Sequence, residues 1–302
     1  MTEKSAAEIL ITGATGNVGR ELVKQLSTRK VPFRAMIRSM KDATALSAVE
    51  GAELVDGDFN DAQSLARALQ GMKRAFLLTS SSERTETQQS TFVETASRAG
   101  IQHIVKLSQW AASTDSPVRF LRYHAAVERK IKDSGMAYTF LRPNLFMQGL
   151  LGLRETIIGQ GKFFAPIGEA RISVIDVRDI AAAGAAALAE EGHQGRTYNL
   201  TGPQALSHGE MAEKLSRVLG QRIEFVDIPP AAMREALLAA GLPVWQADGL
   251  IEDYAHYSRG EAAEVASGVQ DATGKPPRCF EDFASDYAQA FSGTLQEAQY
   301  TQ

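Results

Sequence analysis

The stretch Glu8-Ile-Leu-Ile-Thr-Gly-Ala-Thr-Gly-Asn-Val-Gly-Arg20 carries the strongest structural signal in the chain. A β-branched apolar run comes first, three spaced glycines follow, and a helical pattern begins directly after them. A strand, a glycine turn and a helix in this order predict the first βα unit of a dinucleotide-binding fold. In that unit Gly13 permits the turn off the strand, Gly16 lets backbone N–H groups approach a pyrophosphate, and Gly19 lets the helix pack closely on the sheet.

The N-terminus of this helix is predicted to bind the cofactor phosphates, because its free N–H groups and its dipole attract anions. We therefore count Thr15, Asn17 and Val18 with the three glycines as cofactor-binding residues. The alternative is a plain glycine turn, which would not need a glycine at all three positions.

Composition and charge exclude several classes of protein. The chain has 302 residues, a net charge of −4 and a single cysteine, Cys279, so it can form neither an intramolecular disulfide nor a cysteine metal site. The five histidines show no paired metal-ligand spacing, and we expect no metal. The mild acidity gives no reason to expect nucleic acid or a membrane as a partner.

The chain also shows no targeting signal. Its N-terminus has no signal-peptide pattern, and the alanine-rich run at residues 180–189 is too short to span a bilayer. We expect a cytoplasmic protein that acts on a small-molecule substrate, with a homodimer left open.

Apolar strand-like runs alternate with helical patterns up to about residue 142. The runs fall at residues 9–12, 33–37, 53–55, 75–79, 103–107 and 138–141, with helices at 18–27, 62–69, 88–99 and 119–134. Repeated βα units predict an α/β fold, a Rossmann-like doubly wound parallel sheet with helices on both faces. Ligands of such sheets bind at the carboxyl ends of the strands.

After residue 143 the alternation loosens. Further strands are expected at 171–175, 197–200 and 223–226, and a helix at 177–189. We predict a nucleotide-binding domain at residues 1–150, to which 171–200 returns. Residues 151–170 and 201–291 are predicted to form a smaller, mostly helical lobe that shapes a substrate cleft, and 292–302 a frayed tail.

The end of the second strand bears on the choice of cofactor. In NAD-binding versions of the fold an acidic residue there accepts the ribose 2′-hydroxyl. Here Arg38 takes that place, with Lys41 beyond, and a guanidinium can bind a 2′-phosphate through two hydrogen bonds. We therefore predict NADP(H) in preference to NAD(H). The alternatives are that Arg38 is only a solvated surface cation, and that Arg20 binds the phosphate instead.

Topology places further residues along the cofactor. Asp58 and Phe59 follow the third strand, where the adenine ring would lie, although Asp58 serves equally well as the residue that leads into the next helix. Thr79 and Ser80 follow the fourth strand and should pass under the ribose on the nicotinamide side. These predictions rest on position in the fold.

Three segments point to a known family: Thr12-Gly-Ala-Thr-Gly-Asn-Val-Gly19, Tyr123-His-Ala-Ala-Val-Glu-Arg-Lys-Ile-Lys-Asp-Ser-Gly-Met-Ala-Tyr-Thr-Phe-Leu-Arg-Pro-Asn-Leu-Phe-Met147 and Val174-Ile-Asp-Val-Arg-Asp-Ile-Ala181. They resemble the NmrA-like branch of the atypical short-chain dehydrogenase/reductase superfamily, and the likeness runs from about residue 8 to residue 291. The branch contains NAD(P)H-dependent quinone, azo-dye and triphenylmethane-dye reductases, and proteins that sense NADP without catalysis. The resemblance implies the fold and the cofactor class but no particular substrate.

The superfamily ordinarily uses a Tyr-x-x-x-Lys motif and a serine after the fifth strand; the lysine lowers the pKa of the tyrosine that protonates a carbonyl. By the same resemblance, the lysine position here is His124, the tyrosine position is Phe120, and the serine region holds Ser108, which we assign to the cofactor. The usual acid is missing, so ordinary alcohol–ketone chemistry is not expected. Quinones, azo groups and conjugated cations accept hydride without a tuned acid if they are held over the nicotinamide.

His124 is the first candidate for a catalytic role, because it could hydrogen-bond the nicotinamide ribose or protonate a reduced acceptor. Glu128 lies four residues later on the same predicted helix face and could orient it. A structural pair at the boundary of helix and sheet is the alternative. Tyr123 could also donate a proton, although packing is the more common role of such a residue.

Apolar residues after the sixth strand are predicted to frame the nicotinamide and the substrate. Pro143 fixes that turn beside the cofactor, and Phe146 is assigned to both the cofactor and the substrate. Met147 and Leu150 would complete a flat apolar wall, and Trp110 could stack on an aromatic acceptor. The alternatives are that these residues pack in the core or only join the lobes.

Together these residues predict an oxidoreductase that transfers hydride from NADPH to a flat, electron-poor small molecule such as a quinone or an azo compound. The missing Tyr-x-x-x-Lys motif favours an alternative, a non-catalytic NADP(H)-binding redox sensor that acts through a protein partner. The two hypotheses differ in whether a pocket opens over the nicotinamide or side chains fill that space.

Overall fold

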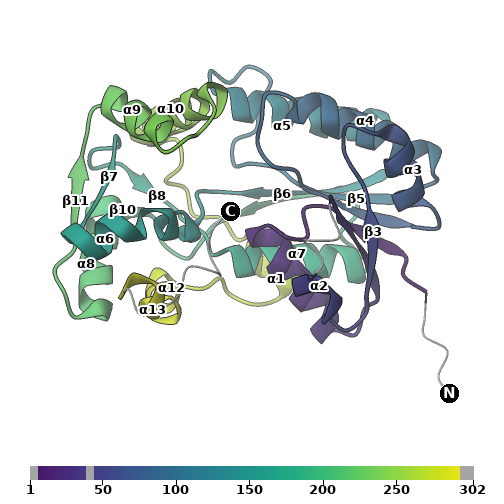
Figure 1. The fold of residues 1–302 in the computed structure, drawn as a ribbon, viewed down its shortest axis with the longest axis horizontal. Coiled ribbons are helices and arrows are strands. Elements are labelled where there is room, and N and C mark those ends of the chain that lie inside the picture. Colours follow the sequence, from purple (N-terminus) through teal and green to yellow (C-terminus); the bar gives the residue numbers. More distant parts are fainter. Residues whose placement is uncertain (1–5, 39–43, 293–302) are drawn as a thin grey trace.

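The centre of the computed structural model, which describes residues 6–38 and 44–292, is a seven-stranded parallel sheet (Figure 1). The strand order is β3-β2-β1-β4-β5-β6-β9. The strands are β1 (Ile9–Ile11), β2 (Phe33–Ile37), β3 (Ala52–Asp56), β4 (Arg74–Leu77), β5 (His103–Leu107), β6 (Ala137–Pro143) and β9 (Arg196–Leu200). The predicted doubly wound α/β sheet is confirmed. Lys41 and residues 293–302, most of the expected tail, lie outside the described residues.

Helices cover both faces of this sheet (Figure 1). Over one face lie α3 (Ala62–Leu69), α4 (Thr85–Arg98) and α5 (Arg119–Asp133), and over the other lie α1 (Asn17–Thr28), α2 (Thr44–Ser47) and α7 (Val177–Ala189). In α1, Val18, Leu22 and Leu26 recur at helical spacing and are all buried. Because both faces are covered, strands such as β1 are buried throughout and have continuous apolar sequences.

The strand order reverses between β1 and β4, because the chain first builds outward to β3 and then returns to the other side of β1. The hydroxyl of Thr12, directly after β1, lies 2.9 Å from the carbonyl oxygens of both Phe76 and Leu78 and accepts from the Leu78 N–H. It thereby fixes the ends of the two strands side by side. In open parallel sheets, ligands bind in the crevice outside the carboxyl ends at such a reversal.

A lobe lies beyond the carboxyl ends of β5 and β6 (Figure 1). Its two small sheets pair β10 with β8 and β11 with β7. The lobe contains η2 (Met147–Leu153), α6 (Arg154–Gln160), β7 (Lys162–Ala165), β8 (Arg171–Ile172), β10 (Leu206–Ser207), α8 (His208–Leu219), β11 (Glu224–Asp227), α9 (Pro230–Ala239), α10 (Val244–Ser258), α12 (Phe280–Asp286) and α13 (Ala288–Phe291). Its core is rich in phenylalanine, with Phe163, Phe280, Phe283 and Phe291 all buried.

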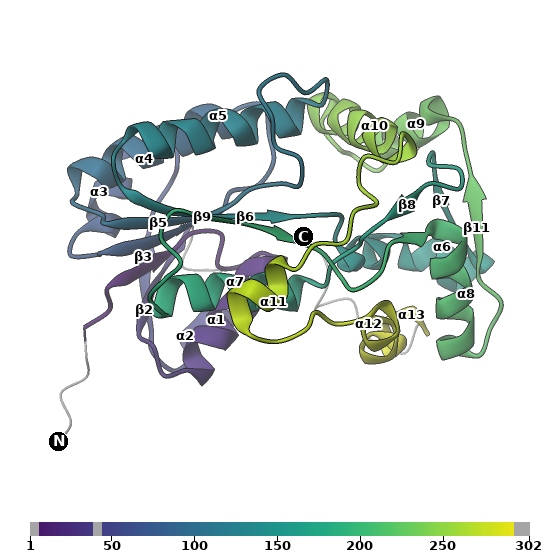
Figure 2. The ribbon, with the colours of Figure 1, turned by 180° about the vertical axis from the view of Figure 1, so that it is seen from behind.

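The boundary between sheet and lobe differs in two places from the sequence expectation. Residues 171–172 pair with β10, and Val174 packs in the lobe core, so the return to the sheet begins only near Ile175. Helix α11 (Gly268–Thr273) packs on α7 and β9 although it lies in the expected lobe segment (Figure 2). Val269 and Ala272 join the apolar layer around α1 and α7, which accounts for that position. Across residues 6–38 and 44–292, none of the helices is long and apolar enough to cross a bilayer.

Helices α9 and α10 form a hairpin whose second helix is held against the start of α5. The Arg119 guanidinium pairs with the Glu252 carboxylate at 2.6 Å. The Phe120 ring lies 5.3 Å from the Trp245 ring, and a Cβ on Gly249 would fall 2.3 Å from the Phe120 Cζ. Phe120 stands where the family resemblance expects a catalytic tyrosine. Here it packs against α10 and anchors the hairpin.

Candidate active site

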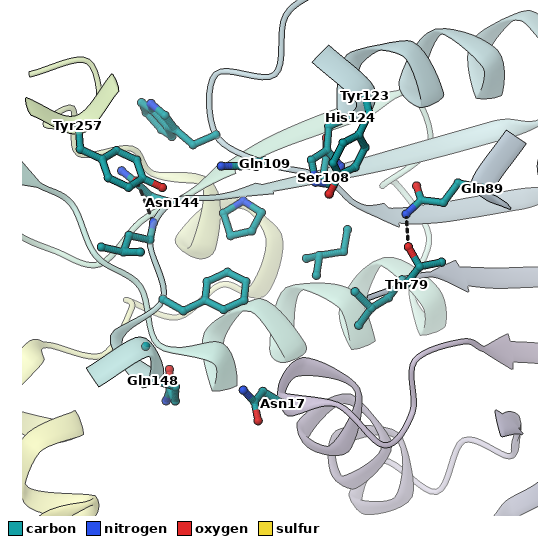
Figure 3. A pocket seen from close by; sticks show the side chains of 17 residues that line it. Asn17, Thr79, Gln89, Ser108, Gln109, Tyr123, His124, Asn144, Gln148 and Tyr257 are labelled. Carbon is teal, nitrogen blue, oxygen red and sulfur yellow. Dashed lines mark hydrogen bonds between the residues drawn. The ribbon is translucent and has the colours of Figure 1, made fainter. Parts of the chain in front are cut away.

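A cavity of about 370 Å³ opens at the carboxyl ends of β4, β5 and β6, between the start of α1 and the lobe (Figure 3). Residues that follow three different strands meet there, which is how parallel sheets build ligand sites. Of the residues predicted from the sequence, the cavity brings together Asn17, Thr79, Ser108, Trp110, Tyr123, His124, Pro143 and Phe146.

The glycine turn beside this cavity has the form that a dinucleotide site requires. Gly13 has a φ of +65°, in the left-handed region that favours glycine. A Cβ on Gly19 would lie 2.0 Å from the Gly13 carbonyl oxygen, so α1 can begin this close to the turn only with glycine there. A Cβ on Gly16 would make only an ordinary contact, 3.5 Å from the same oxygen, so the space beside Gly16 is open.

The first turn of α1 supplies the donors for this site. Gly16 is the N-cap of the helix and offers no side chain to accept from the leading N–H groups. Thr15 is half-buried in the turn, Val18 packs beneath the helix, and Asn17 is exposed at the cavity edge. Unoccupied N–H donors beside open space fit the phosphates of a nicotinamide dinucleotide.

Thr79 and Gln89 form a polar wall on the α4 side of the cavity (Figure 3). The Gln89 Nε2 donates to the Thr79 Oγ1 at 2.8 Å. The Gln89 Oε1 is buried and has no hydrogen-bond partner within the described part of the chain. A buried acceptor left over at a cavity edge fits a ligand hydroxyl such as that of a ribose. Ser80, by contrast, is exposed, and its carbonyl oxygen accepts from the Thr85 hydroxyl.

His124 lies on α5 at the cavity wall, and its hydrogen-bond partner is a lysine from the sheet. The Lys106 Nζ on β5 lies 2.8 Å from the His124 Nδ1 and donates to the Leu107 carbonyl oxygen at 2.9 Å. Lys106 is completely buried, and this burial lowers the pKa of its ammonium to about 7. Burial, reinforced by the positive charges of Lys106 and Arg142, holds the His124 pKa well below its ordinary value, so the ring is neutral.

The hydrogen-bond partner of His124 is Lys106 and not Glu128, which was expected to orient it. The Glu128 carboxylate accepts from the Arg142 Nε at 2.9 Å, from the Arg142 Nη2, and from the Ser108 hydroxyl. Glu128 is buried on α5, and Arg142 reaches it from the neighbouring β6. The prediction failed because a carboxylate four residues from the histidine also faced a guanidinium on the sheet, and the charged partner is the stronger one.

Tyr123 lines the cavity beside His124, with the two ring centroids 4.3 Å apart. Its hydroxyl lies 3.4 Å from the Ser81 Oγ. Burial raises the pKa of this phenol to about 12, which makes it a poor proton donor at neutral pH. His124 differs from Tyr123 in its hydrogen bond to the buried Lys106.

The lobe side of the cavity combines fixed aromatic rings with a polar group. The Trp110 indole N–H donates to the Glu261 carbonyl oxygen at 3.1 Å, which fixes the ring. Gln109 lines the cavity, and its amide donates at 3.1 Å to both carboxylate oxygens of Asp253. Burial raises the Asp253 pKa to about 7. Tyr257 from α10 closes this side (Figure 3).

Two predicted substrate residues have a different role. Met147 and Leu150 are buried in the core cluster of the lobe, and neither is among the residues that line the cavity. Both belong to η2, whose helical turns direct Gln148 and Gly149 toward the cavity and the apolar pair toward the lobe. The apolar wall is provided instead by Leu145 and Phe146.

At the predicted adenine end, Arg38, directly after β2, and Asp58 are both exposed. The Asp58 Oδ1 accepts from the backbone and side-chain N–H groups of Asn60, both at 2.8 Å, so this carboxylate shapes the turn before α3. Phe59 is half-buried and packs on Phe92, with centroids 5.6 Å apart.

Residues 5–274 match the NmrA-like family. The chain belongs to this family. Among similar proteins, an NAD(P)H azoreductase of Xenophilus azovorans is 36% identical over 283 residues, which cover 94% of this chain and 99% of the relative. The structure of an Escherichia coli NADPH-dependent quinone oxidoreductase complexed with NADPH is 28% identical, with a TM-score of 0.83, and covers 92% of this chain and 99% of that one. The structure of the Citrobacter sp. triphenylmethane reductase complexed with NADP(H) is 27% identical, with a TM-score of 0.81, and covers 95% of this chain and 100% of that one.

The site of this NmrA-like chain includes residues that the sequence interpretation missed. Gln89, Gln109 and Gln148 line the cavity from helices or loops whose sequences carry no recognisable motif. Lys106 did carry a signal: it is the single charged side chain in the middle of the expected strand at 103–107. A strand buried on both faces should be apolar, so a lysine inside one indicates a functional group.

Proposed function

We propose that the protein is an NADPH-dependent reductase of flat, electron-poor small molecules, with quinones and azo compounds as the acceptor class. The observation that carries this proposal is the open cavity between the glycine turn and the lobe. A reductase must admit an acceptor beside the nicotinamide, whereas a sensor of NADP(H) needs no such space. The azoreductase, quinone oxidoreductase and dye reductase similar to this chain support the same reaction class.

The residues present fit the cofactor. Bound NADPH supplies the hydride. Gly13, Gly16 and Gly19 leave room and N–H donors for its phosphates, and the unpaired Gln89 Oε1 offers an acceptor to a ribose hydroxyl. Pro143 lines the cavity at the carboxyl end of β6, and sheets of this kind bind their ligands at that end of the strands.

The remaining walls suit a flat acceptor. Phe146 and the fixed Trp110 offer aromatic faces on which a conjugated ring can stack. His124 lines the same cavity with a neutral imidazole ring (Figure 3). Orientation of the acceptor then accounts for most of the rate, and His124 is the candidate for supplying a proton.

The test is NADPH oxidation by the purified protein on a panel of quinones, azo dyes, enones and ketones, with calorimetric titration of NADPH and NADP⁺ alongside. We expect tight NADPH binding, turnover of quinones or azo dyes, and little activity on simple ketones, because the tyrosine acid of the superfamily is absent. Unequal affinities for NADPH and NADP⁺ without any turnover would support the sensor hypothesis instead. An absence of binding to either form would overturn both.

We also propose that Arg38 selects NADP(H). In Arg38→Asp the new carboxylate would repel a 2′-phosphate, so we expect NADPH affinity to fall by about tenfold or more while NADH affinity stays unchanged. Calorimetric titration of both cofactors measures this. Arg20→Asp is the matched control, since Arg20 is a second exposed arginine near the glycine turn. If Arg20→Asp lowers the affinity for NADPH but not for NADH, and Arg38→Asp changes neither affinity, the assignment of Arg38 is wrong.

A further inference from the structure

Lys106 is a charged residue buried inside the central sheet. It is the fourth residue of β5, all of whose residues are buried, and its side chain has no exposed area. It points to the face of the sheet that α5 covers, where it meets His124. Burial of an ammonium group is costly, so such a group persists where its charge or its proton is used.

The surroundings of Lys106 direct its proton to one place. The charged groups nearby are Glu128 on α5 and Arg142 on β6, and these two already form an ion pair with each other. On its other side Lys106 is paired in register with Leu77 of β4, which is apolar and buried. The Lys106 ammonium therefore has two hydrogen-bond acceptors, the Leu107 carbonyl oxygen and the His124 Nδ1. Of these two, only the His124 Nδ1 can take up a proton.

This contact fixes the tautomer of His124. An ammonium group only donates hydrogen bonds, so the His124 Nδ1 must accept from it. In a neutral ring the proton is then on Nε2. The neighbouring Tyr123 contributes an aromatic ring to this wall, and its hydroxyl is engaged with Ser81. The Nε2 proton is thus the one that His124 can offer to a molecule in the cavity.

We propose that Lys106 is a positioning and proton-supplying residue: it holds His124 in the Nε2-protonated tautomer and replaces the proton that His124 gives to a reduced acceptor. The proposal rests on the proposed function. The acceptor class follows from it: quinones and azo compounds become anions on hydride addition and need a proton, whereas a cationic triphenylmethane dye becomes neutral and needs none.

The protons balance without any further reactant. The His124 Nε2–H bond breaks as an O–H or N–H bond forms on the anionic product, and the Lys106 Nζ–H bond breaks as an Nδ1–H bond forms on the ring. The result is a neutral Lys106 and a neutral His124 in the other tautomer. After the product leaves, a proton from water binds at Nε2, and the Nδ1 proton returns to Lys106. Each cycle therefore takes one proton from solvent.

The first test needs no activity. Proton–nitrogen correlation spectra of the histidine rings in the cofactor-free protein report each tautomer directly. We expect the Nε2-protonated form for His124 in the wild type and loss of that fixed state in Lys106→Met, whose side chain has a similar length and no charge. Lys73→Met is the control, because Lys73 is half-exposed at the opposite end of β4. An unchanged His124 spectrum in Lys106→Met would overturn the proposal.

The second test compares acceptors. In Lys106→Met we expect kcat for a quinone to fall by about tenfold or more, within the usual range for a lost general acid, while kcat for a cationic triphenylmethane dye stays the same. Protonated Lys106 is the competent form, so wild-type kcat for the quinone should be highest below pH 7 and fall as pH rises through the lysine pKa of about 7. Lys106→Met should show a flat profile.

The outcomes separate the two claims. Equal losses with the quinone and with the dye would mean that Lys106 only supports the fold, which would overturn the proton-supplying role. Lys106→Gln gives a second check, since its amide can donate a hydrogen bond but cannot release a proton. We expect this variant to keep the Nε2-protonated tautomer of His124 but to lose the pH dependence of kcat for the quinone. A wild-type protein that reduces none of the acceptors would count against the proposed function, while the ring spectra would still decide whether Lys106 fixes His124.

Discussion

Gly19→Ala is expected to lower both the thermal stability and the NADPH affinity of the protein, whereas Gly16→Ala should lower the affinity alone. A Cβ at position 19 would lie 2.0 Å from the Gly13 carbonyl oxygen, and backbone atoms cannot move aside without reshaping the turn. We expect a loss of about 1–3 kcal/mol in the free energy of unfolding, as for other overpacked sites. At position 16 the nearest atom is at 3.5 Å, so only a ligand would meet the new methyl group.

Thermal melting and calorimetric titration of NADPH measure the two effects. Gly159→Ala is the matched control, because Gly159 is an exposed glycine within α6 with no atom near its missing Cβ. There alanine should stabilise by about 0.5–1 kcal/mol, the usual gain in a helix. If Gly16→Ala binds NADPH as tightly as the wild type, the phosphates do not approach this turn and the cofactor placement fails.

Glu128→Ala is expected to destabilise the protein by about 3–5 kcal/mol, the range for breaking a buried ion pair from one side. Glu128 is almost completely buried and neutralises the partly buried guanidinium of Arg142. Without it Arg142 would lose its partner, the Ser108 hydroxyl would lose its acceptor, and the charge that favours protonated Lys106 would vanish. The free energy of unfolding from urea denaturation measures the loss.

Glu94→Ala is the control for this change. Glu94 also pairs with a cation on α5, Lys130, but about half of each side chain is exposed, so we expect a much smaller loss than in Glu128→Ala. Similar losses for the two variants would show that the Glu128 pair does not hold α5 to the sheet as described. Glu128→Gln, which keeps the shape and removes the charge, should fall between them.

The sheet could be predicted from the sequence because its signals are local. The strand at 33–37 has the bounds expected of it, and the glycines at 13, 16 and 19 stand where the turn needs them. The lobe was harder to predict, since β8 and β10 have only two residues each and owe their existence to tertiary pairing. A two-residue strand has no periodicity to detect.

In the candidate site, too, local features could be predicted and tertiary contacts could not. His124 and Ser108 could be placed from the topology, because both follow from the positions of α5 and β5. The partners of these residues could not, since Gln109 reaches Asp253 and Arg142 reaches Glu128 only after the chain has folded. The start of η2 shows the limit of prediction from sequence: Phe146, just before this helix, lines the cavity, yet Met147, its first residue, packs in the lobe.

The most direct test of the account is anaerobic mixing of the preformed protein–NADPH complex with a limiting quinone, followed by the loss of NADPH absorbance. We expect one NADPH oxidised for each quinone reduced, and we expect Gly16→Ala to need more NADPH to form the complex that reacts. Tight binding of NADPH with no oxidation by any quinone or azo compound would contradict it, and would show that the cavity holds the cofactor without serving as an active site.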